Sequence, residues 1–400
     1  MVFLYNKDIE QSITYEALIE DVNNFSSIDN IIDVKDPVKF FIKLLANICH
    51  NIDCVILDND ISKEDKERYK KDFSLNAKPT LIKINNFEDL LSSITYSKSK
   101  ISIFTSGTTG EPKKVDHNVD KFIKMSRIAD KYKNDVWAFL YNPTHMAGLQ
   151  VFFQALLNKN SLIYLFQTSR IEFMNACEKH SITNISATPT FYRLLAPFDF
   201  QLNTIRKCTL GGEKSDMNLI KKLKAVFPNS NIYNIYASTE AGSIFISNKG
   251  DVFKVLDTLK DKVRFDNNEI IIHKSLLGNF YKEEWFSTGD IVEFTNEDKT
   301  EFRIASRKSD IVNIGGNRID LLEVESEIYK VKGVKSTLVY AVDNSVLGKI
   351  ITAEIVSSIT YSKKEFKEEL KKKLQLYKIP TMIKIVEELQ VTRTGKLKRN

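Results

Sequence analysis

A chain of 400 residues with 42% hydrophobic and 28% charged residues is long enough for two or three folded domains. The apolar fraction disfavours disorder, and no stretch approaches the roughly 20 apolar residues of a membrane helix. The first ten residues include Lys7, Asp8 and Glu10 and are unlike a signal peptide, so the sequence favours a cytoplasmic protein over a membrane or secreted one.

The net charge of +6 is concentrated at one end of the chain. Residues 361–400 contain 12 Lys/Arg and 5 Asp/Glu, whereas the rest of the chain holds 46 and 47. Such a segment is typical of a nucleic-acid-binding surface, of a solvated helix face, or of a cationic lobe that closes over an anion. Charge alone does not decide among the three.

The four cysteines are Cys49, Cys54, Cys177 and Cys208, with no paired spacing. Cys49, His50 and Cys54 could form half of a metal site, but no second cluster completes it. Reduced thiols are therefore expected.

Short apolar runs alternate with amphipathic stretches through the first 240 residues. Strands are predicted at residues 53–57, 101–104, 136–141, 162–165, 185–187 and 232–236. Helices are predicted at residues 37–49, 119–132, 171–180 and 216–227, the first opened by Asp36 and Pro37. This alternation predicts an α/β fold with a mainly parallel sheet.

Two further changes of pattern follow. From about residue 242 close-set strands are predicted, as in an antiparallel sheet or barrel, at residues 245–247, 252–256, 262–265, 269–273, 291–294 and 300–304. After about residue 309 come a helix (321–329), two strands (336–342 and 349–356), a basic helix with the capping box Ser362–Glu365, and a final strand. We predict a large N-terminal domain, residues 1–306, with parallel sheets and a β-rich subdomain, and a small mobile α+β domain, residues 307–400.

One polar loop directly follows the predicted strand at residues 101–104. Its glycines allow tight turns that point backbone N–H groups into one concavity, and its hydroxyls and lysine add donors for a phosphate. A polar turn without function is the alternative. The candidate phosphate-binding residues are Thr105, Ser106, Gly107, Thr108, Thr109, Gly110 and Lys113.

This loop resembles the signature of the adenylate-forming superfamily, which includes acyl-CoA synthetases, adenylation domains of peptide synthetases and luciferases. Four further segments match that family in the expected order. The loop lies at residue 105, earlier than usual, so the resemblance implies a shortened N-terminal subdomain. Residues 1–100 carry no motif that we can assign.

The segment 234–240 resembles the adenine and magnesium segment of the family. The resemblance implies that Asn234 contacts the adenine edge, Tyr236 stacks on the base, Thr239 binds the α-phosphate and Glu240 ligates Mg²⁺. An aromatic face suits a base, and a hard cation prefers a carboxylate oxygen. Ala237 stands where the family usually has Gly.

Two other segments resemble the pocket walls of acyl-CoA synthetases. Gly211, Gly212 and Glu213 match the Gly-Gly segment beside the adenine and the acyl group, and His145 and Gly148 match a His-x-x-Gly segment beside the acyl pocket. Amino-acid-activating members usually carry an Asp there, and residues 142–156 contain none. An α-amino acid substrate is therefore disfavoured. Because the shortened N-terminal subdomain leaves fewer residues to wall a long tunnel, a short-chain or small aromatic acid is expected.

The ribose and the domain junction have their own motifs. Trp285–Asp290 resembles the ribose motif, which implies that Asp290 accepts hydrogen bonds from both ribose hydroxyls. Arg307 would reach ribose and phosphate oxygens. Ser309 occupies the hinge position, which is usually Asp or Lys.

The C-terminal motifs concern the second half-reaction and the catalytic lysine. Gly315 and Gly316 would lie where the pantetheine chain passes, and Lys396, in Thr392–Lys396, would bridge the carboxylate and the α-phosphate. The basic end of the chain is then interpreted as a cationic lid over a nucleotide.

The resemblance implies an AMP-forming acid–thiol ligase that uses ATP and Mg²⁺ to convert a small carboxylic acid to an acyl adenylate. The acyl group would then pass to the thiol of CoA. The alternative acceptor is the phosphopantetheine arm of an acyl carrier protein, and the sequence does not separate the two. A nucleic-acid-binding protein is the alternative of another class, but Tyr361, Phe366 and Tyr377 are too scattered for a stacking platform.

Overall fold

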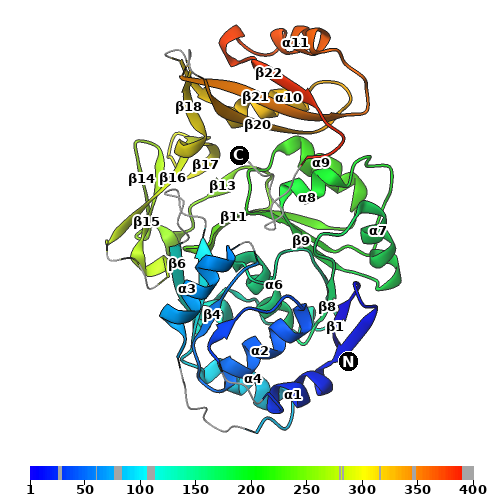
Figure 1. Cartoon of the computed structure of the whole chain (residues 1–400), viewed down its shortest axis with the longest axis vertical. Coiled ribbons are helices and arrows are strands. Elements are labelled where there is room, and N and C mark those ends of the chain that lie inside the picture. Colours follow the sequence, from blue (N-terminus) through cyan, green and yellow to red (C-terminus); the bar gives the residue numbers. More distant parts are fainter. Residues whose placement is uncertain are drawn as a thin grey trace.

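The structure is a computed structural model, and it describes residues 1–25, 29–59, 61–75, 83–105, 113–278, 281, 283–314, 317–344 and 348–389 (Figure 1). Figure 1 shows the N-terminal helices at one end of the molecule and the C-terminal strands and helices at the other. Within these ranges no helix combines the length and the hydrophobicity needed to cross a bilayer.

The largest sheet has eight strands in the order β12-β11-β10-β9-β7-β8-β1-β2. Its six inner strands run parallel, and β12 and β2 pair antiparallel at the two edges, which confirms the predicted mainly parallel sheet. The strands are β1 (Val2–Asn6), β2 (Gln11–Thr14), β7 (Val136–Phe139), β8 (Ser161–Tyr164), β9 (Asn184–Ala187), β10 (Lys207–Gly211), β11 (Asn231–Ser238) and β12 (Gly242–Ser247).

A second sheet carries the predicted phosphate loop between its last two strands. Its order is β3 (Ile31–Ile32), β4 (Cys54–Ile56), β5 (Lys100–Thr105) and β6 (Lys113–Asn118). Strands β5 and β6 pair antiparallel with Thr105 opposite Lys113, so the two ends of the loop lie side by side.

Helices cover both sheets. One apolar core joins the two sheets, and the helices between residues 170 and 226 pack in a second core on the large sheet. Phe41 in α2 stacks on Phe152 in α6, with ring centroids 4.2 Å apart. Asp36 caps α2 by accepting from the Lys39 N–H, with Pro37 in the first turn, as predicted. The helices are α1 (Tyr15–Asn23), α2 (Pro37–Cys49), α3 (Lys63–Phe73), α4 (Phe87–Tyr96), α5 (Val119–Met125), α6 (Met146–Leu156), α7 (Arg170–Lys179), α8 (Pro189–Leu194) and α9 (Met217–Val226).

The helix predicted at residues 119–132 is wrong in its second half. Helix α5 ends at Met125, and only a 3-10 turn, η1 (Asp130–Tyr132), follows. The side chain of Gln154 accepts from the Arg127 N–H and donates to the Arg127 carbonyl oxygen. These bonds replace the helical partners of Arg127, so the chain leaves the helix there.

The β-rich part is a five-stranded antiparallel sheet in the order β13-β17-β16-β15-β14, as predicted. The strand predicted at residues 245–247 is not part of it, because those residues lie in β12, which pairs with β11 at the edge of the large sheet. Strand β16 begins at Trp285, whereas the sequence predicted its start at residue 291. Its pairing with β15 has a register irregularity near residues 288–290, where Gly289 has a φ of +77°, and this irregularity lets the pairing extend to Trp285. The elements are β13 (Phe253–Lys254), η2 (Asp257–Leu259), β14 (Val263–Asp266), β15 (Glu269–His273), η3 (Lys274–Leu276), β16 (Trp285–Phe294) and β17 (Glu301–Arg307).

The C-terminal part has a separate apolar core around α10, β20, β21 and α11. The helix at residues 321–329 and the capping box of Ser362 and Glu365 are present as predicted. The predicted domain boundary falls at the end of β17 and stays a prediction. The elements are η4 (Lys308–Asp310), β18 (Ile311–Ile314), β19 (Asn317–Asp320), α10 (Leu321–Tyr329), β20 (Val334–Asn344), β21 (Gly348–Ser357), α11 (Lys363–Lys371), η5 (Leu376–Lys378) and β22 (Met382–Ile385).

All four cysteines are buried and unpaired, as expected for reduced thiols. Burial raises the pKa of Cys49 and of Cys208 to about 12. Among the described residues, no three His, Cys, Asp or Glu side chains are grouped to hold a metal ion, so Cys49, His50 and Cys54 do not form such a site.

Candidate functional site

A cavity of about 250 Å³ lies between one face of the large sheet and helices α5 and α6. Because side chains alternate between the faces of a strand, β10 and β11 up to Ala237 contribute every second residue. The strand residues that line it are Trp137 on β7, Ser186 on β9, Lys207, Thr209 and Gly211 on β10, Tyr233, Ile235, Ala237 and Ser238 on β11, and Ser243 and Ile246 on β12. The predicted pocket residues His145 and Gly211 line this cavity, and Gly148 does not.

The two ends of the cavity differ in chemistry. Gly212 and Thr239 lie at the carboxyl ends of β10 and β11, where the predicted nucleotide residues are also found. Lys207 and Trp137 lie at the opposite, amino ends of β10 and β7, and Arg127 also belongs to the lining. None of the described residues that line the cavity is Asp or Glu.

The segment with His145 is fixed by a carboxylate that the sequence did not reveal. Asp58, just after β4, accepts hydrogen bonds from the Asn142 amide (2.7 Å) and from the Thr144 hydroxyl. His145 Nε2 lies 3.5 Å from the same Asp58 oxygen. Residues 1–100 therefore contribute a buried carboxylate that holds Asn142 and His145, two residues of the cavity lining. No local motif marks Asp58, because its partners lie more than eighty residues away.

Gly148 has a packing role in this arrangement. A Cβ placed on Gly148 would lie 2.2 Å from the Asn142 carbonyl oxygen and 3.0 Å from Pro143 Cα. Only glycine lets α6 approach the segment 142–145 this closely.

The turn after β11, which holds Thr239 and Glu240, is tied to the strand after the predicted phosphate loop. His117 Nε2, on β6, lies 2.8 Å from the Thr239 carbonyl oxygen. Lys121 Nζ donates to the carbonyl oxygens of Glu240 (3.4 Å) and Leu276 (3.0 Å). Two segments more than a hundred residues apart are therefore joined by direct hydrogen bonds.

The hydrogen bonds determine which nitrogen of His117 carries the proton. A carbonyl oxygen only accepts, so Nε2 must be protonated, and Nδ1 then accepts from Lys121 Nζ at 3.3 Å. Burial, followed by the charge of Lys121, lowers the pKa of His117 to about 4. Burial also lowers the pKa of Lys121 to about 8, against the opposing charge of Glu240.

Three predicted nucleotide residues from three different strands meet on the other side of β11. The Tyr236 hydroxyl donates to Asp290 Oδ2 at 2.6 Å, and Arg307 Nε lies 3.5 Å from Asp290 Oδ1. Burial raises the pKa of Asp290, although Arg307 and Tyr236 both oppose the shift. The arrangement presents an aromatic ring, a carboxylate and a guanidinium within one small volume.

Strand β11 separates this group from the cavity. Tyr233, Ile235 and Ala237 line the cavity, whereas Asn234 and Tyr236 alternate with them along the strand. Asn234 is buried, at 5% exposure. The turn at Thr239 follows the end of β11, so it borders both the cavity and the group of Tyr236, Asp290 and Arg307.

The remaining predicted residues are placed as follows. Gly212 lines the cavity at φ +83°, and Glu213 accepts from the Thr190 N–H at 2.9 Å. Lys113 and Ser309 are exposed. The predicted residues that lie outside the described ranges are Ser106, Gly107, Thr108, Thr109, Gly110, Gly315, Gly316 and Lys396.

Glu240 has the properties of a single-carboxylate magnesium ligand. Within the described part of the chain its side chain forms no ion pair, and only its backbone carbonyl accepts hydrogen bonds. Proteins commonly bind Mg²⁺ through one or two carboxylates together with substrate phosphates and water. The residue present fits that role without a larger acidic cluster.

Many lysines of the basic C-terminal segment are paired with carboxylates. Such pairs reduce the positive charge that this face offers to a nucleic acid. The pairs are Lys371–Glu368, Lys372–Glu369, Lys378–Glu323 and Lys384–Glu354.

Comparison with known families gives matches over most of the chain. Residues 37–266 match the family described as AMP-binding enzyme, and residues 323–396 match the AMP-binding enzyme C-terminal domain. The first match covers more than half of the chain.

Individual relatives are distant. The chain is 24% identical to the mitochondrial acyl-coenzyme A synthetase ACSM4 of Mus musculus over 79% of its length, and it spans 64% of that relative. It is 25% identical to a 2-succinylbenzoate–CoA ligase of Staphylococcus epidermidis over 74% of its length and 68% of the relative. The structure of o-succinylbenzoate CoA synthetase from Bacillus subtilis, in complex with its acyl-adenylate intermediate, matches with a TM-score of 0.71 and 17% identity, over 99% of this chain and 94% of that one. That structural likeness shows the shared fold.

Proposed function

The chain belongs to the AMP-binding enzyme family, and on that premise we propose that it is an AMP-forming ligase that joins a carboxylic acid to the thiol of CoA. The observation that carries the proposal is the contact of Tyr236, Asp290 and Arg307 on one side of β11. The other side of this strand lines a largely apolar cavity. A nucleotide on one side of β11 and an acid on the other would come together at Thr239.

The nucleotide is assigned to the side of Tyr236. The ring of Tyr236 stacks on adenine, Asn234 contacts the base edge, and Asp290 accepts from the ribose hydroxyls. Arg307 lies near enough to the Asp290 carboxylate to reach the ribose and the phosphates. A carboxylate has lone pairs enough to keep the hydrogen bond from Tyr236 while it accepts from a ribose.

The first half-reaction is an in-line displacement at the α-phosphorus. A substrate carboxylate oxygen attacks phosphorus, and the bond to the bridging oxygen of the β-phosphate breaks, so that pyrophosphate leaves. Catalysis of such a step is mostly positioning and charge stabilisation. Thr239 holds the α-phosphate, and His117 and Lys121 fix the backbone that positions Thr239 and Glu240. A magnesium ion held by Glu240 would neutralise phosphate charge.

The second half-reaction transfers the acyl group. The thiol sulfur attacks the carbonyl carbon of the mixed anhydride, and AMP leaves. We assign Lys396 to the first step only, Ser309 to the hinge that withdraws it, and Gly315 and Gly316 to the path of the pantetheine chain. A carrier-protein phosphopantetheine would present the same thiol and remains the second acceptor.

The proposal is tested by exchange of labelled pyrophosphate into ATP over a panel of carboxylic acids. We expect exchange that depends on the acid and on Mg²⁺, and a loss of roughly tenfold or more in apparent ATP affinity in Asp290→Asn, because the neutral amide is a weaker acceptor for two hydroxyls. Exchange that is independent of every acid tested would contradict an adenylate intermediate. CoA and a phosphopantetheinylated carrier protein, offered separately, distinguish the two acceptors.

A further inference from the structure

Two positively charged side chains line the end of the cavity at the amino end of β10, away from the predicted nucleotide residues. Lys207 is the first residue of β10, and Gly211 is its last, so the two lie about 13 Å apart along the strand. Lys207 and Arg127 both line the cavity. The only carboxylate that influences the Lys207 charge among the described residues is Asp135.

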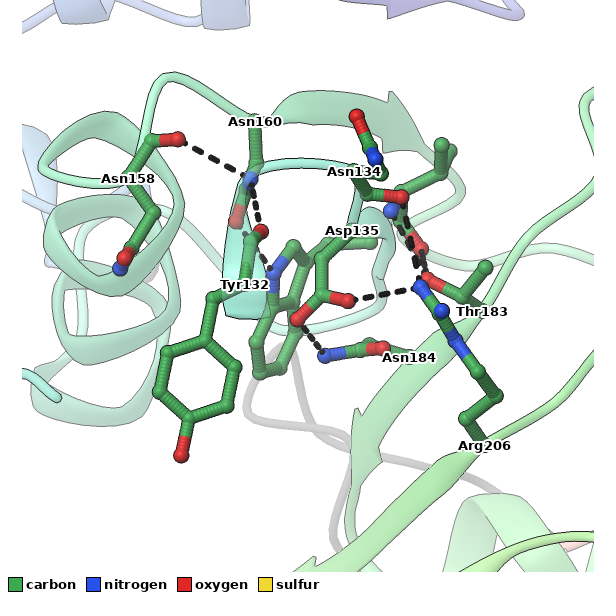
Figure 2. Close-up of polar contacts among 10 residues, drawn as sticks. Tyr132, Asn134, Asp135, Asn158, Asn160, Thr183, Asn184 and Arg206 are labelled. Carbon is green, nitrogen blue, oxygen red and sulfur yellow. Dashed lines mark hydrogen bonds and ion pairs between the residues drawn. The ribbon is translucent and has the colours of Figure 1, made fainter. Parts of the chain in front are cut away.

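Asp135 is already engaged by other partners. One of its oxygens accepts from Arg206 at 2.9 Å and the other from Asn184 at 2.8 Å. Figure 2 shows Asp135 between these two side chains. In the described part of the chain, neither Lys207 nor Arg127 forms an ion pair with a carboxylate. Among the described residues, the pair therefore has no carboxylate in direct contact, and only the more distant Asp135 acts on the charge of Lys207.

The surroundings of Lys207 make it unfavourable for its ammonium group to lack a carboxylate partner. Lys207 is half-buried, with Nζ 5.3 Å from the centre of the Trp137 ring. Burial, and then the charge of Arg127, lower its pKa against the opposing charge of Asp135. A cation that is partly removed from water and close to a second cation favours a bound anion.

A ligand that enters the cavity passes an uncharged stretch before it reaches these cations. The Thr209 hydroxyl donates a hydrogen bond to the Ser186 hydroxyl oxygen at 2.6 Å, and Ile235 and Val151 supply apolar surface. The cavity therefore has a polar end beside Thr239, an uncharged middle and a cationic far end.

We propose that the acid activated by this chain is a dicarboxylic acid, whose second carboxylate binds Lys207 and Arg127 at the far end of the cavity. The inference rests on the proposed function, which places the reacting carboxylate beside Gly211 and Thr239. The two carboxylates are separated by about 10 Å, a little less than the strand between the two ends. The absence of acidic side chains among the described lining residues fits a substrate with a negative charge at each end.

Binding without ATP gives a test that does not depend on catalysis. Trp137 lies against Lys207 and reports on the far end through its fluorescence, and Trp285→Phe leaves it as the only tryptophan. In that background suberate is titrated against octanoate, which has the same chain without the second carboxylate. Glutarate and pentanoate form a shorter pair. We expect suberate to bind about tenfold or more tightly than octanoate, as a charge-assisted hydrogen bond would give.

The variants separate the charge of Lys207 from its packing. Lys207→Met keeps an apolar stem over Trp137 and should abolish the preference for suberate, whereas Lys207→Arg should retain it. Lys222→Met is the matched control, because Lys222 Nζ lies over the ring of Phe198 at 5.6 Å and is outside the cavity. This control should leave the preference unchanged.

The outcomes distinguish this inference from the proposed function. Equal binding of suberate and octanoate, or a preference that survives Lys207→Met, would overturn the dicarboxylate assignment, and pyrophosphate exchange with monocarboxylates would then still support the ligase. Tight, Lys207-dependent binding of suberate without exchange for any acid would support the anion site and contradict the adenylation.

Discussion

His117 and Lys121 are the least expected members of the site, because His117 is a buried base and Lys121 a half-buried one, and both contact the turn at Thr239 and Glu240. Their hydrogen bonds require a neutral His117 with its proton on Nε2. A protonated ring would carry charge on both nitrogens, beside the ammonium of Lys121. The neutral state of one imidazole thus contributes to the position of Thr239 and Glu240, the residues proposed to face the α-phosphate.

This requirement predicts a pH dependence of stability. The pKa of His117 is lowered to about 4, below the value of about 6.5 in an unfolded chain. Between these values the unfolded state binds more protons, so stability falls as the pH falls. From about pH 7 to about pH 5 this contribution amounts to about 2 kcal/mol. Chemical denaturation across that range should show it.

His117→Gln is the control for this measurement. Glutamine keeps a donor for the Thr239 carbonyl oxygen but does not titrate, whereas Asp116 and Lys121 remain in place. The stability of the variant should therefore vary less with pH than that of the parent. Parallel curves for the two proteins would rule out a neutral His117 as the cause.

A second prediction at the residue scale is that Glu240 ligates Mg²⁺. Glu240→Gln should raise the Mg²⁺ concentration needed for half-maximal pyrophosphate exchange by roughly 10- to 100-fold, since an amide is a poorer ligand for a hard cation. Magnesium titrations of both proteins measure the shift, with denaturation curves to verify the fold. An unchanged titration would remove Glu240 from the metal site.

At the scale of elements, helix α6 shows how packing shapes the cavity. Gly148→Ala should destabilise the protein by about 1–3 kcal/mol, because the new Cβ meets backbone that cannot turn away. The acid KM should rise as well, since the displaced segment carries His145. Gly211→Ala is the matched control for stability: its Cβ would meet no atom closer than 3.6 Å. Equal stability of the two variants would contradict the packing role.

The elements also show what sequence reasoning could and could not find. Helix α2 was predictable because Asp36, Pro37 and an apolar repeat act within a few residues. The break after Met125 was not, since it depends on Gln154 side-chain bonds from another helix. The roles of Asp58 and Lys207 were missed for the same reason. Periodicity records which face of an element is apolar, but not which distant element packs on it.

At the scale of the whole molecule, the two proposed half-reactions require different positions of the C-terminal part. Lys396→Ala should lower adenylate formation by roughly 100-fold or more, as for the loss of a charge that stabilises a transition state. Transfer from a supplied acyl adenylate to CoA should be largely retained. Single-turnover assays of each step measure the two effects. Equal losses in both steps would contradict a lysine that serves only the first.

The central claim is that an acyl adenylate forms on this chain. Its most direct test is to incubate the protein with ATP, Mg²⁺ and the acid that gives the greatest exchange, without thiol, and to identify the bound product by mass spectrometry after rapid quenching. We predict an acyl adenylate in roughly one-to-one ratio with the protein, released as acyl-CoA and AMP when CoA is added. Formation of ADP, or bound ATP with no mixed anhydride for any acid, would contradict the account.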